Sequence, residues 1–521
     1  MKTYKQHLIT SKSFGEKLDP IKKPTFRSSA IFPIINNKFL ETNITFLGYW
    51  LIKRKILEVT VLITLRNQKG VIIKRESMII DQIKSYKVSI RKMINNRNSD
   101  FVGSLELEVF STRDMVFPYP AFVLNYLSKK SSTFVHTCGR VYNDFEDLKL
   151  NSDIQVPESG FDIIPNDDFL PFFAFVNGPI PILKKIIDVE VINFKGKILK
   201  KKIVIKKTDA LETKFIYFLT QKEKIFLEGQ KGTIKIKHNL EGFFPRFLCG
   251  NIKRDKSISS LTHTYYDTSK STKNSHWPNP DKENLYDSII TFPIFYEKKE
   301  YTELVLYPIY PESNMTFDLE VYDAEGKCLD KIYSFFNINK KLKLPTYINI
   351  NKFLNKEILK KKQNLFAKIL INGKGKLPSR IKFGLNIGKP NKFDIPSNIC
   401  FNAQVPNVEI FKKPGTFKWC PILNNKNSSI ILANFSYAKK GFKKSIVKIK
   451  FWRERDQKFL EKTIVINDNG SHCLEINKNK KIKSFLRGET CWASFESDNP
   501  FLNGYYLEDM GFGIVGADHL F

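Results

Sequence analysis

One β-hairpin pattern occurs four times along the chain. Each copy has two runs in which apolar and polar residues alternate, joined by a short polar turn, and three of the four turns contain glycine. The copies span residues 57–81, 187–205, 317–335 and 447–466. A repeated unit of this kind cannot bury its apolar face alone, so the pattern predicts a chain of similar modules.

The segments around the hairpins repeat as well. An apolar residue, a proline and an isoleucine precede three of them, at 32–34, 292–294 and 420–422, and we assign LPFFAF at 170–175 to that place in the second copy. Behind each hairpin follow more alternating runs, a corner rich in proline, glycine or asparagine, and a closing run. The closing runs are FVHTC (134–138), LTHTYY (261–266), SNICF (397–401) and GADHLF (516–521).

Each repeat therefore holds seven or eight short strands in about 110 residues, which is the size and rhythm of an immunoglobulin-like β-sandwich. We predict an all-β protein of four tandem immunoglobulin-like β-sandwich modules with very little helix, the clearest helical segment being 351–361. The cysteine pair and core tryptophan of true immunoglobulin domains are missing, so the likeness is architectural and carries no function. The expected modules are 28–140, 160–270, 285–405 and 416–521, after a lysine-rich arm at 1–27.

Cysteine usage and apolar runs indicate the compartment. The seven cysteines are scattered without a CxxC pair, which favours free thiols over disulfides or a cysteine zinc site. The first residues lack the apolar core of a secretory signal, and the longest apolar runs are too short for a membrane span. We expect a cytoplasmic protein with no membrane span.

The formal net charge is +32, and lysines outnumber arginines 71 to 14. Readers of phosphates and bases rely on arginine, because its planar fork binds in a bidentate manner. The lysines are spread along the whole chain, and the abundance of residues with AT-rich codons explains part of their excess. A solvated lysine coat is the simpler interpretation, although a non-specific, salt-sensitive attraction to polyanions is still expected.

Three of the seven histidines fall in closing runs: His136, His263 and His519. Histidine is a common metal ligand and acid–base group, so these residues could mark equivalent pockets, or one shared pocket if the modules close into a ring. The third module has Asn398 near that place. The alternative is a half-buried histidine in each module, bonded to the backbone. Since no module holds two histidines and a carboxylate together, we predict no metal and no cofactor.

Other candidate residues lie near these histidines. Carboxylates could serve as acceptors, aromatic rings could stack on a sugar or a base, and the rare arginine is either paired within the fold or binds a ligand. These candidates are Asp518, Asp267, Tyr265, Tyr266, Trp277 and Arg246.

The chain carries no phosphate-binding loop, HExxH, GxSxG or similar catalytic motif. We therefore favour a non-catalytic scaffold or recognition protein that binds a glycan or a protein partner, since serial sandwiches offer loops, length and avidity. Two alternatives stay open. One is an enzyme with an inter-module site around His263 and His519, and the other is an electrostatic polyanion binder.

Overall fold

The computed structural model describes a chain of antiparallel sheets. It covers residues 26–521 apart from 95–99, 116–119, 137–138, 142–157, 166, 219, 245, 267–275, 340–341, 343, 362, 379–380, 390–394, 405, 407–408, 410–412, 424–426, 441–442 and 513–514. Over these residues the fold is all-β with little helix, as predicted, and eight sheets of four or five strands form four repeated units. Most of the expected arm at 1–27, and Asp267, lie outside the described residues.

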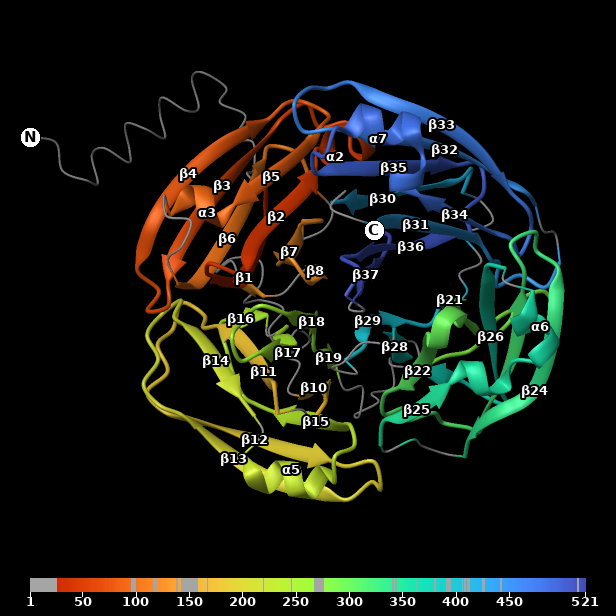
Figure 1. The fold of residues 1–521 in the computed structure, drawn as a ribbon, viewed down its shortest axis with the longest axis horizontal. Coiled ribbons are helices and arrows are strands. Elements are labelled where there is room, and N and C mark those ends of the chain that lie inside the picture. The colour runs from red at the N-terminus through yellow and green to blue at the C-terminus, as the bar shows by residue number, and fades with distance from the viewer. Residues whose placement is uncertain are drawn as a thin grey trace, which may run out of the picture.

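One sheet of each module faces the outside of the molecule and contains the repeated hairpin (Figure 1). In spatial order, the outer sheets consist of β1 (Phe26–Asn36), β6 (Phe101–Ser111), β3 (Val59–Asn67) and β4 (Ile72–Ile80); β13 (Ile198–Ile205), β12 (Lys185–Ile192), β15 (Gly232–Lys237), β10 (Glu158–Ile163) and β19 (Tyr265–Tyr266); β21 (Ser288–Ile294), β26 (Leu365–Gly373), β23 (Met315–Tyr322) and β24 (Cys328–Ile338); and β30 (Thr416–Ile422), β35 (Cys491–Ser497), β32 (Ser445–Trp452) and β33 (Phe459–Ile466).

The second sheet of each module faces the centre of the molecule. The inner sheets consist of β5 (Ser85–Ser89), β2 (Glu41–Leu47), β7 (Val123–Leu127) and β8 (Ser132–His136); β14 (Thr213–Tyr217), β11 (Phe169–Val176), β17 (Leu248–Lys253) and β18 (Ser259–His263); β25 (Thr346–Asn349), β22 (Tyr301–Leu306), β28 (Lys382–Gly388) and β29 (Ser397–Asn402); and β34 (Ser471–Glu475), β31 (Asn427–Asn434), β36 (Leu502–Asp509) and β37 (Val515–His519). An immunoglobulin constant domain pairs sheets of four and three strands, whereas in modules 1, 3 and 4 both sheets have four.

Burial explains why the two sheets look different in the sequence. The outer hairpin strands alternate, as β33 does with a buried residue at every second position near its end, because one face meets water. The central strands of the inner sheets, such as β28, are buried on both faces, whereas the end strands β14 and β34 are partly exposed. In β36, Tyr506 packs in a core that joins modules 1 and 4 with part of module 2, whereas Tyr505 packs in the core of module 3. Each inner sheet therefore serves its own module and a neighbour.

Short helices follow the fifth strand of every module, before the chain returns to the outer sheet. These are α3 (Ile90–Met93), α5 (Gln221–Leu227), α6 (Lys356–Lys360) and α7 (Lys480–Leu486), with the 3-10 turns η4 (Ile350–Phe353) and η6 (Ile476–Lys478). Two further short pieces lie elsewhere: α2 (Tyr49–Lys53) follows β2, and the 3-10 turn η3 (Glu297–Lys299) follows β21. The helix expected at 351–361 is confirmed by η4 and α6. In the described chain, no helix is both long and apolar enough to cross a bilayer.

Our assignment of LPFFAF in module 2 is wrong. We matched it to the apolar-Pro-Ile sequence (the Pro-Ile step) that precedes the hairpin in the other three modules. Residues 170–175 lie in β11, the second strand of module 2, and the first strand is β10. In β10, Asp162 pairs with Thr233 just as Pro33 pairs with Ser104 in module 1. A proline suits an edge strand such as β1. In module 2 the strand is covered on its other side by β19, and an aspartate takes that place.

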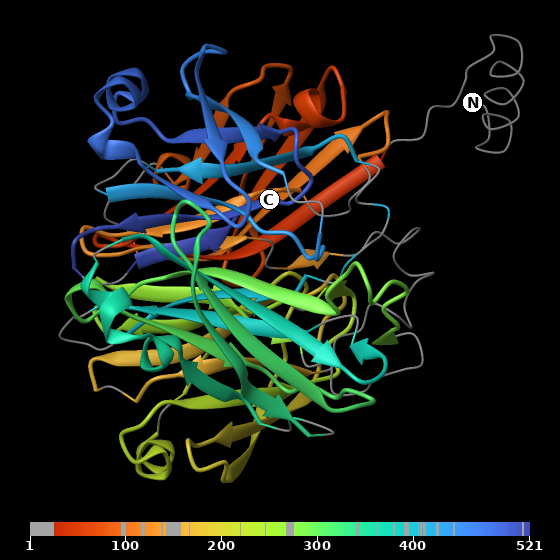
Figure 2. The same cartoon turned by 90° about the vertical axis from the view of Figure 1, so that its right-hand side faces the viewer.

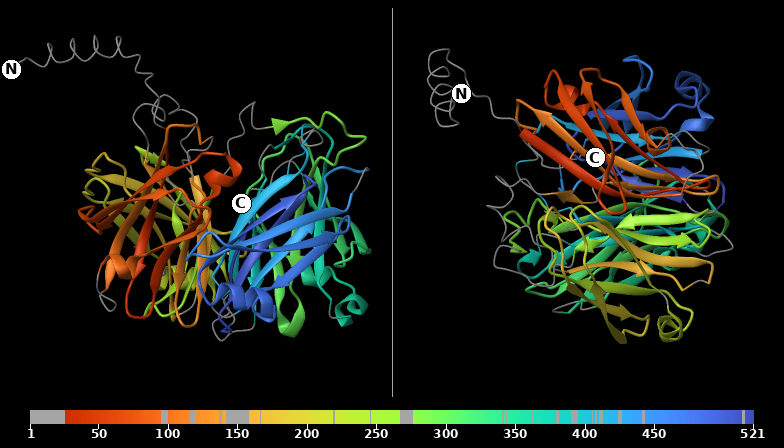
Figure 3. Two further views of the ribbon diagram at one scale, coloured as in Figure 1. Left: turned by 90° about the horizontal axis from the view of Figure 1, so that it is seen from above. Right: turned by 90° about the vertical axis from the view of Figure 1, so that its left-hand side faces the viewer.

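The four modules lie side by side in a single layer and close into a ring (Figures 1, 2 and 3). Their closing strands meet at the axis of this ring, where β8 contacts β18 and β37, and β29 contacts the same two strands. Two further pairings tie distant segments: β9 (Arg140–Val141) with β16 (Phe243–Phe244), and β20 (His276–Trp277) with β27 (Leu377–Pro378).

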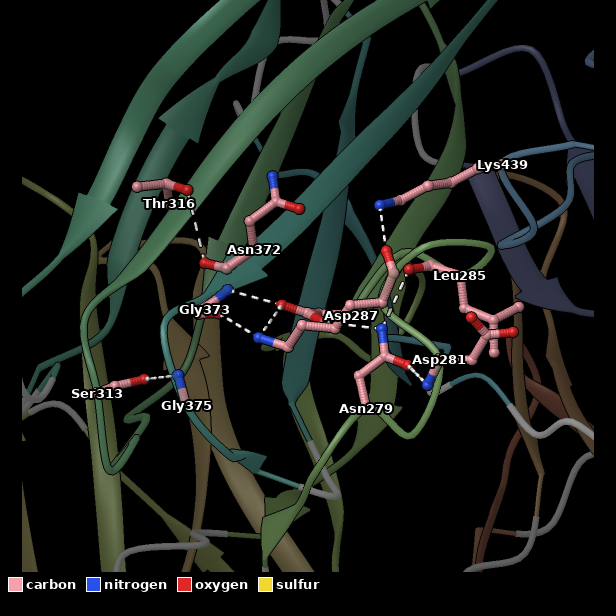
Figure 4. A network of polar contacts seen from close by, with 11 residues as sticks. Asn279, Asp281, Leu285, Asp287, Ser313, Thr316, Asn372, Gly373, Gly375 and Lys439 are labelled. Atoms are coloured by element: carbon pink, nitrogen blue, oxygen red, sulfur yellow. Dashed lines mark hydrogen bonds and ion pairs between the residues drawn. The ribbon is translucent and has the colours of Figure 1, made fainter.

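The segment before module 3 fastens two modules together (Figure 4). Asp287 accepts hydrogen bonds from Asn279 Nδ2 at 2.9 Å and from the amide of Gly373 at 2.9 Å. Lys439 of module 4 reaches the same segment and donates to the carbonyl of Lys282 at 2.6 Å. The described part of this linker therefore connects modules 3 and 4 through hydrogen bonds.

Candidate functional site at the ring axis

The ring brings the three closing-strand histidines together. The ring centroid of His136 lies 5.0 Å from that of His263 and 4.9 Å from that of His519. These residues end β8, β18 and β37, which come from modules 1, 2 and 4. The three histidines therefore lie in one cluster, and that this cluster forms a shared pocket stays a prediction.

Asp518 joins this cluster through His136. The Nδ1 atom of His136 lies 2.5 Å from Oδ2 of Asp518, and Oδ1 accepts the backbone amide of His519 at 2.8 Å. Burial alone would raise the pKa of Asp518, but His136 and His519 outweigh it and hold this pKa below its usual value. Asp518 is therefore a buried carboxylate in its ionised form.

The other two histidines are fixed by backbone carbonyls. His263 Nδ1 lies 3.0 Å from the carbonyl of Thr264, and His519 Nδ1 lies 3.0 Å from that of Leu520. Only an N–H can donate there, so Nε2 of each ring carries the lone pair. Burial lowers the pKa of His263 well below its usual value, with Arg246 adding to the shift, and burial lowers the pKa of His519 to about 4. Both rings are neutral at pH 7.

The surroundings of the cluster are apolar on one side and cationic on the other. The ring of Phe521 lies 5.5 Å from that of His136. Arg246 and Lys382 act electrostatically on His263 and on the buried thiol of Cys400, whose pKa is raised by burial. The side chain of His519 keeps 30% of its exposure, so the cluster is reached from solvent past this residue.

A small polar cavity adjoins the cluster between modules 2 and 3. Its volume is about 40 Å³, and His263, Asp162, Lys231, Asn386 and Asn398 are among the residues that line it. A space of this size holds a few water molecules and excludes a sugar or nucleotide. An enzyme site at His263 would need a larger opening than this cavity provides.

Asp162 organises the polar side of the cavity. Its Oδ1 atom accepts hydrogen bonds from Tyr347 at 2.8 Å and from Thr233 at 3.2 Å, while the buried Oδ2 has no hydrogen-bond partner among the described residues. Burial raises the pKa of Asp162 to about 6, and the Tyr347 hydrogen bond and Lys231 limit the rise.

A second chain of polar contacts runs beside Asp162. Lys231 forms an ion pair with Glu303, which accepts from Asn386 Nδ2 at 2.9 Å, and Asn386 in turn accepts from Asn398 at 2.8 Å. Asn398 thus faces the same cavity as His263. Sequence reasoning missed Asp162, Lys231 and Glu303. The one available signal was an aspartate at the place of the Pro-Ile proline.

The aromatic candidates do not form an open platform. Tyr265 is 3% exposed and stacks on Tyr307 of module 3, with ring centroids 3.5 Å apart. Trp277 lies in β20, packs against the core of module 3, and buries an Nε1 without a hydrogen-bond partner in the described structure. Tyr266 pairs through its backbone with Ser159, and nothing is described of its side chain. Stacking of a sugar on Tyr265 would require the two modules to separate.

The sequence matches no protein-family model and has no significant match among curated proteins.

Proposed function

We propose that this chain is a non-catalytic scaffold or recognition protein whose outer sheets bind a protein partner. The observation that carries the proposal is that each outer sheet ends in a strand with exposed apolar side chains. These end strands are β4, β13, β24 and β33. The exposed residues are Ile72, Ile73, Ile79, Ile198, Val204, Tyr333, Phe459 and Val465.

An end strand offers unpaired backbone N–H and C=O groups, and a partner strand that pairs with them gains main-chain hydrogen bonds. Apolar side chains at alternate positions add contacts and fix the register. Lysines on the same strands, such as Lys74 and Lys202, oppose indiscriminate pairing between copies. The four edges repeat around the ring, so one chain could hold several partner segments at fixed separation.

The interior of the ring supports a scaffold more than a catalyst. Both faces of the inner sheets pack within or between modules. At the ring axis, Asp518 holds His136, and backbone carbonyls hold His263 and His519. A protein partner is favoured over a glycan because Tyr265, the central residue of the glycan hypothesis, is covered by Tyr307.

Matched single variants of the full chain test the proposal. Ile79→Glu, Val204→Glu, Tyr333→Glu and Val465→Glu each place a charge on one end strand, while Leu183→Glu places the same charge at a residue outside the strands that is 82% exposed. Cross-linking in cells followed by mass spectrometry compares the partners retained. A protein held by the parent and by Leu183→Glu but lost from one edge variant supports the proposal. Partners retained by every edge variant would contradict it.

A further inference from the structure

We propose that the axis cluster binds one divalent transition-metal ion of the Zn²⁺ class through His136, Asp518 and His519, and that this ion acts as a structural clasp between the first and last modules. The proposal goes beyond the scaffold function and stands or falls independently of it.

The ligand geometry carries the first step. One ligand atom from each of His136, Asp518 and His519 lies within 4.8 Å of the other two. The shortest separation is the 2.5 Å between His136 Nδ1 and Asp518 Oδ2, and His519 Nε2 lies 3.9 Å from Asp518 Oδ1. Two imidazoles and a carboxylate suit zinc, which binds such atoms at about 2.0–2.2 Å. Tetrahedral ligand atoms at these distances from one ion lie about 3.3–3.6 Å apart, so binding requires the contact between His136 and Asp518 to open by roughly 1 Å while His519 moves closer.

The hydrogen bond of His519 agrees with this role. Its Nδ1 lies 3.0 Å from the Leu520 carbonyl and donates its proton there, which leaves Nε2 free to coordinate. A carbonyl bonded to the far nitrogen is the usual support of a metal-binding histidine. When an ion takes the place of the proton between His136 Nδ1 and Asp518 Oδ2, Nε2 of His136 carries one proton, any second proton is released to solvent, and a water molecule completes the coordination.

The position of the cluster indicates a structural role for the ion at the joint between modules 4 and 1. Modules 1 and 2, 2 and 3, and 3 and 4 are joined by the chain, but modules 4 and 1 meet without a covalent link. His136 belongs to β8 of module 1, and Asp518 and His519 belong to β37 of module 4, so an ion bound here would hold the one joint that the chain leaves open. The exposure of His519 provides an entry path from solvent.

His263 is a neighbour of the site rather than a ligand. Its ring lies 5.0 Å from that of His136, but it is not one of the three residues whose ligand atoms gather within 4.8 Å. Arg246 and Lys382 act electrostatically on His263, and Lys418 acts on His519, where the Asp518 carboxylate compensates a positive charge.

Zinc and cobalt binding to the full chain, freed of metal by chelation, tests the proposal. We expect one Zn²⁺ per chain by calorimetry and elemental analysis, and a rise in unfolding temperature with added Zn²⁺. His519→Ala removes a ligand and should weaken binding more than the roughly 10–100-fold typical of losing an outer-shell partner. His472→Ala, a partly buried histidine of β34 in the same module, is the matched control and should bind as the parent does.

Two further measurements distinguish loss of the ion from unfolding and identify the ligand atoms. Asp518→Asn preserves the shape of the side chain but removes its charge, so it should stay folded and lose the ion. The Co²⁺ derivative should show visible bands of nitrogen and oxygen coordination without a thiolate charge-transfer band. Binding that survives both His519→Ala and Asp518→Asn, cobalt bound through thiolate, or no stoichiometric binding by the folded parent would each overturn the proposal.

Discussion

His136 and Asp518 are 382 positions apart in the chain, and their side chains meet at 2.5 Å in the interior of the ring. This contact belongs to a wider joint between the first and last modules. Trp492 Nε1 donates to Thr45 Oγ1 at 2.6 Å, and Tyr49 stacks on Trp419 with centroids 5.0 Å apart. Closure of the ring thus depends on side chains rather than on chain connectivity.

Asp518→Asn, measured on the metal-free chain, should lower the free energy of unfolding by about 1–3 kcal/mol, because the buried hydrogen bond with His136 loses its charged acceptor. The same substitution in a His136→Ala background should cost much less, since the partner is already gone. Denaturant unfolding of the four variants forms a double-mutant cycle. Strictly additive losses would mean that the two side chains do not stabilise one another.

Thr45→Val should destabilise the joint in a different way. The substitution keeps the shape of the side chain but leaves the buried Nε1 of Trp492 without its acceptor, at a cost of about 1–3 kcal/mol. Because modules 1 and 4 share one apolar core, we expect both to unfold in the same, earlier calorimetric transition. Two separate transitions, with only module 1 shifted, would argue against a shared core. Thr60→Val, at an exposed position of β3, is the control.

The Asp162 carboxyl should make stability depend on pH. Burial raises its folded-state pKa to about 6, above the value of about 3.9 in an unfolded chain. Between these values the folded state holds more protons than the unfolded state, so the free energy of unfolding should fall as pH rises through this window. Asp162→Asn removes the cost of ionising a buried carboxyl group. Above pH 6, the free energy of unfolding of this variant should exceed that of the parent by at most about 3 kcal/mol.

At pH 4, where Asp162 is protonated in the folded state, the parent and Asp162→Asn should unfold at nearly the same denaturant concentration. Asp188→Asn serves as the control, because Asp188 is exposed on β12 and lies outside the cavity. A constant difference between parent and Asp162→Asn at all pH values would show that shape, and not ionisation, decides the effect.

The predictable part of this fold is the part that faces water. Alternation identified the outer hairpins, because a strand with one wet face must alternate. The inner strands gave weaker signals since both faces are buried, and their residues divide between two cores, as Tyr505 and Tyr506 do. The helix α5 was missed although Thr220 and Glu223 form a capping box, because a helix of two turns leaves little periodicity.

The candidate site was predictable only in outline. Three histidines in matching closing runs pointed to a shared place, but their meeting depends on how four modules pack, which no local pattern encodes. The packing of modules also decides the role of Tyr265. The sequence suggested that its ring is a binding platform, but in the structure Tyr307 of module 3 covers it. Asp162 can be recognised as a site residue only once β10 is known to be the first strand of module 2. It then stands at the position that a proline occupies in the other modules.

Tyr265→Ala should therefore act on stability and not on glycan binding. Removing a buried ring stacked between modules 2 and 3 should cost about 3–5 kcal/mol. Tyr265→Phe keeps the stack and should cost far less. Thermal unfolding measures both, and a glycan array compares the folded variants. A glycan bound by the parent and lost in Tyr265→Phe without loss of stability would restore the sugar-binding hypothesis.

The net charge of +32 should produce binding to polyanions that depends on salt and not on sequence. We expect heparin and unrelated DNA duplexes to bind with similar affinity at low salt, and the logarithm of the association constant to fall linearly with that of the salt concentration. Lysines are spread over the outer strands, so Lys202→Gln on β13 should weaken all ligands alike and lower the slope by at most about 1. A duplex that keeps its affinity at physiological salt, or one lysine whose loss abolishes binding, would instead reveal a defined nucleic-acid site.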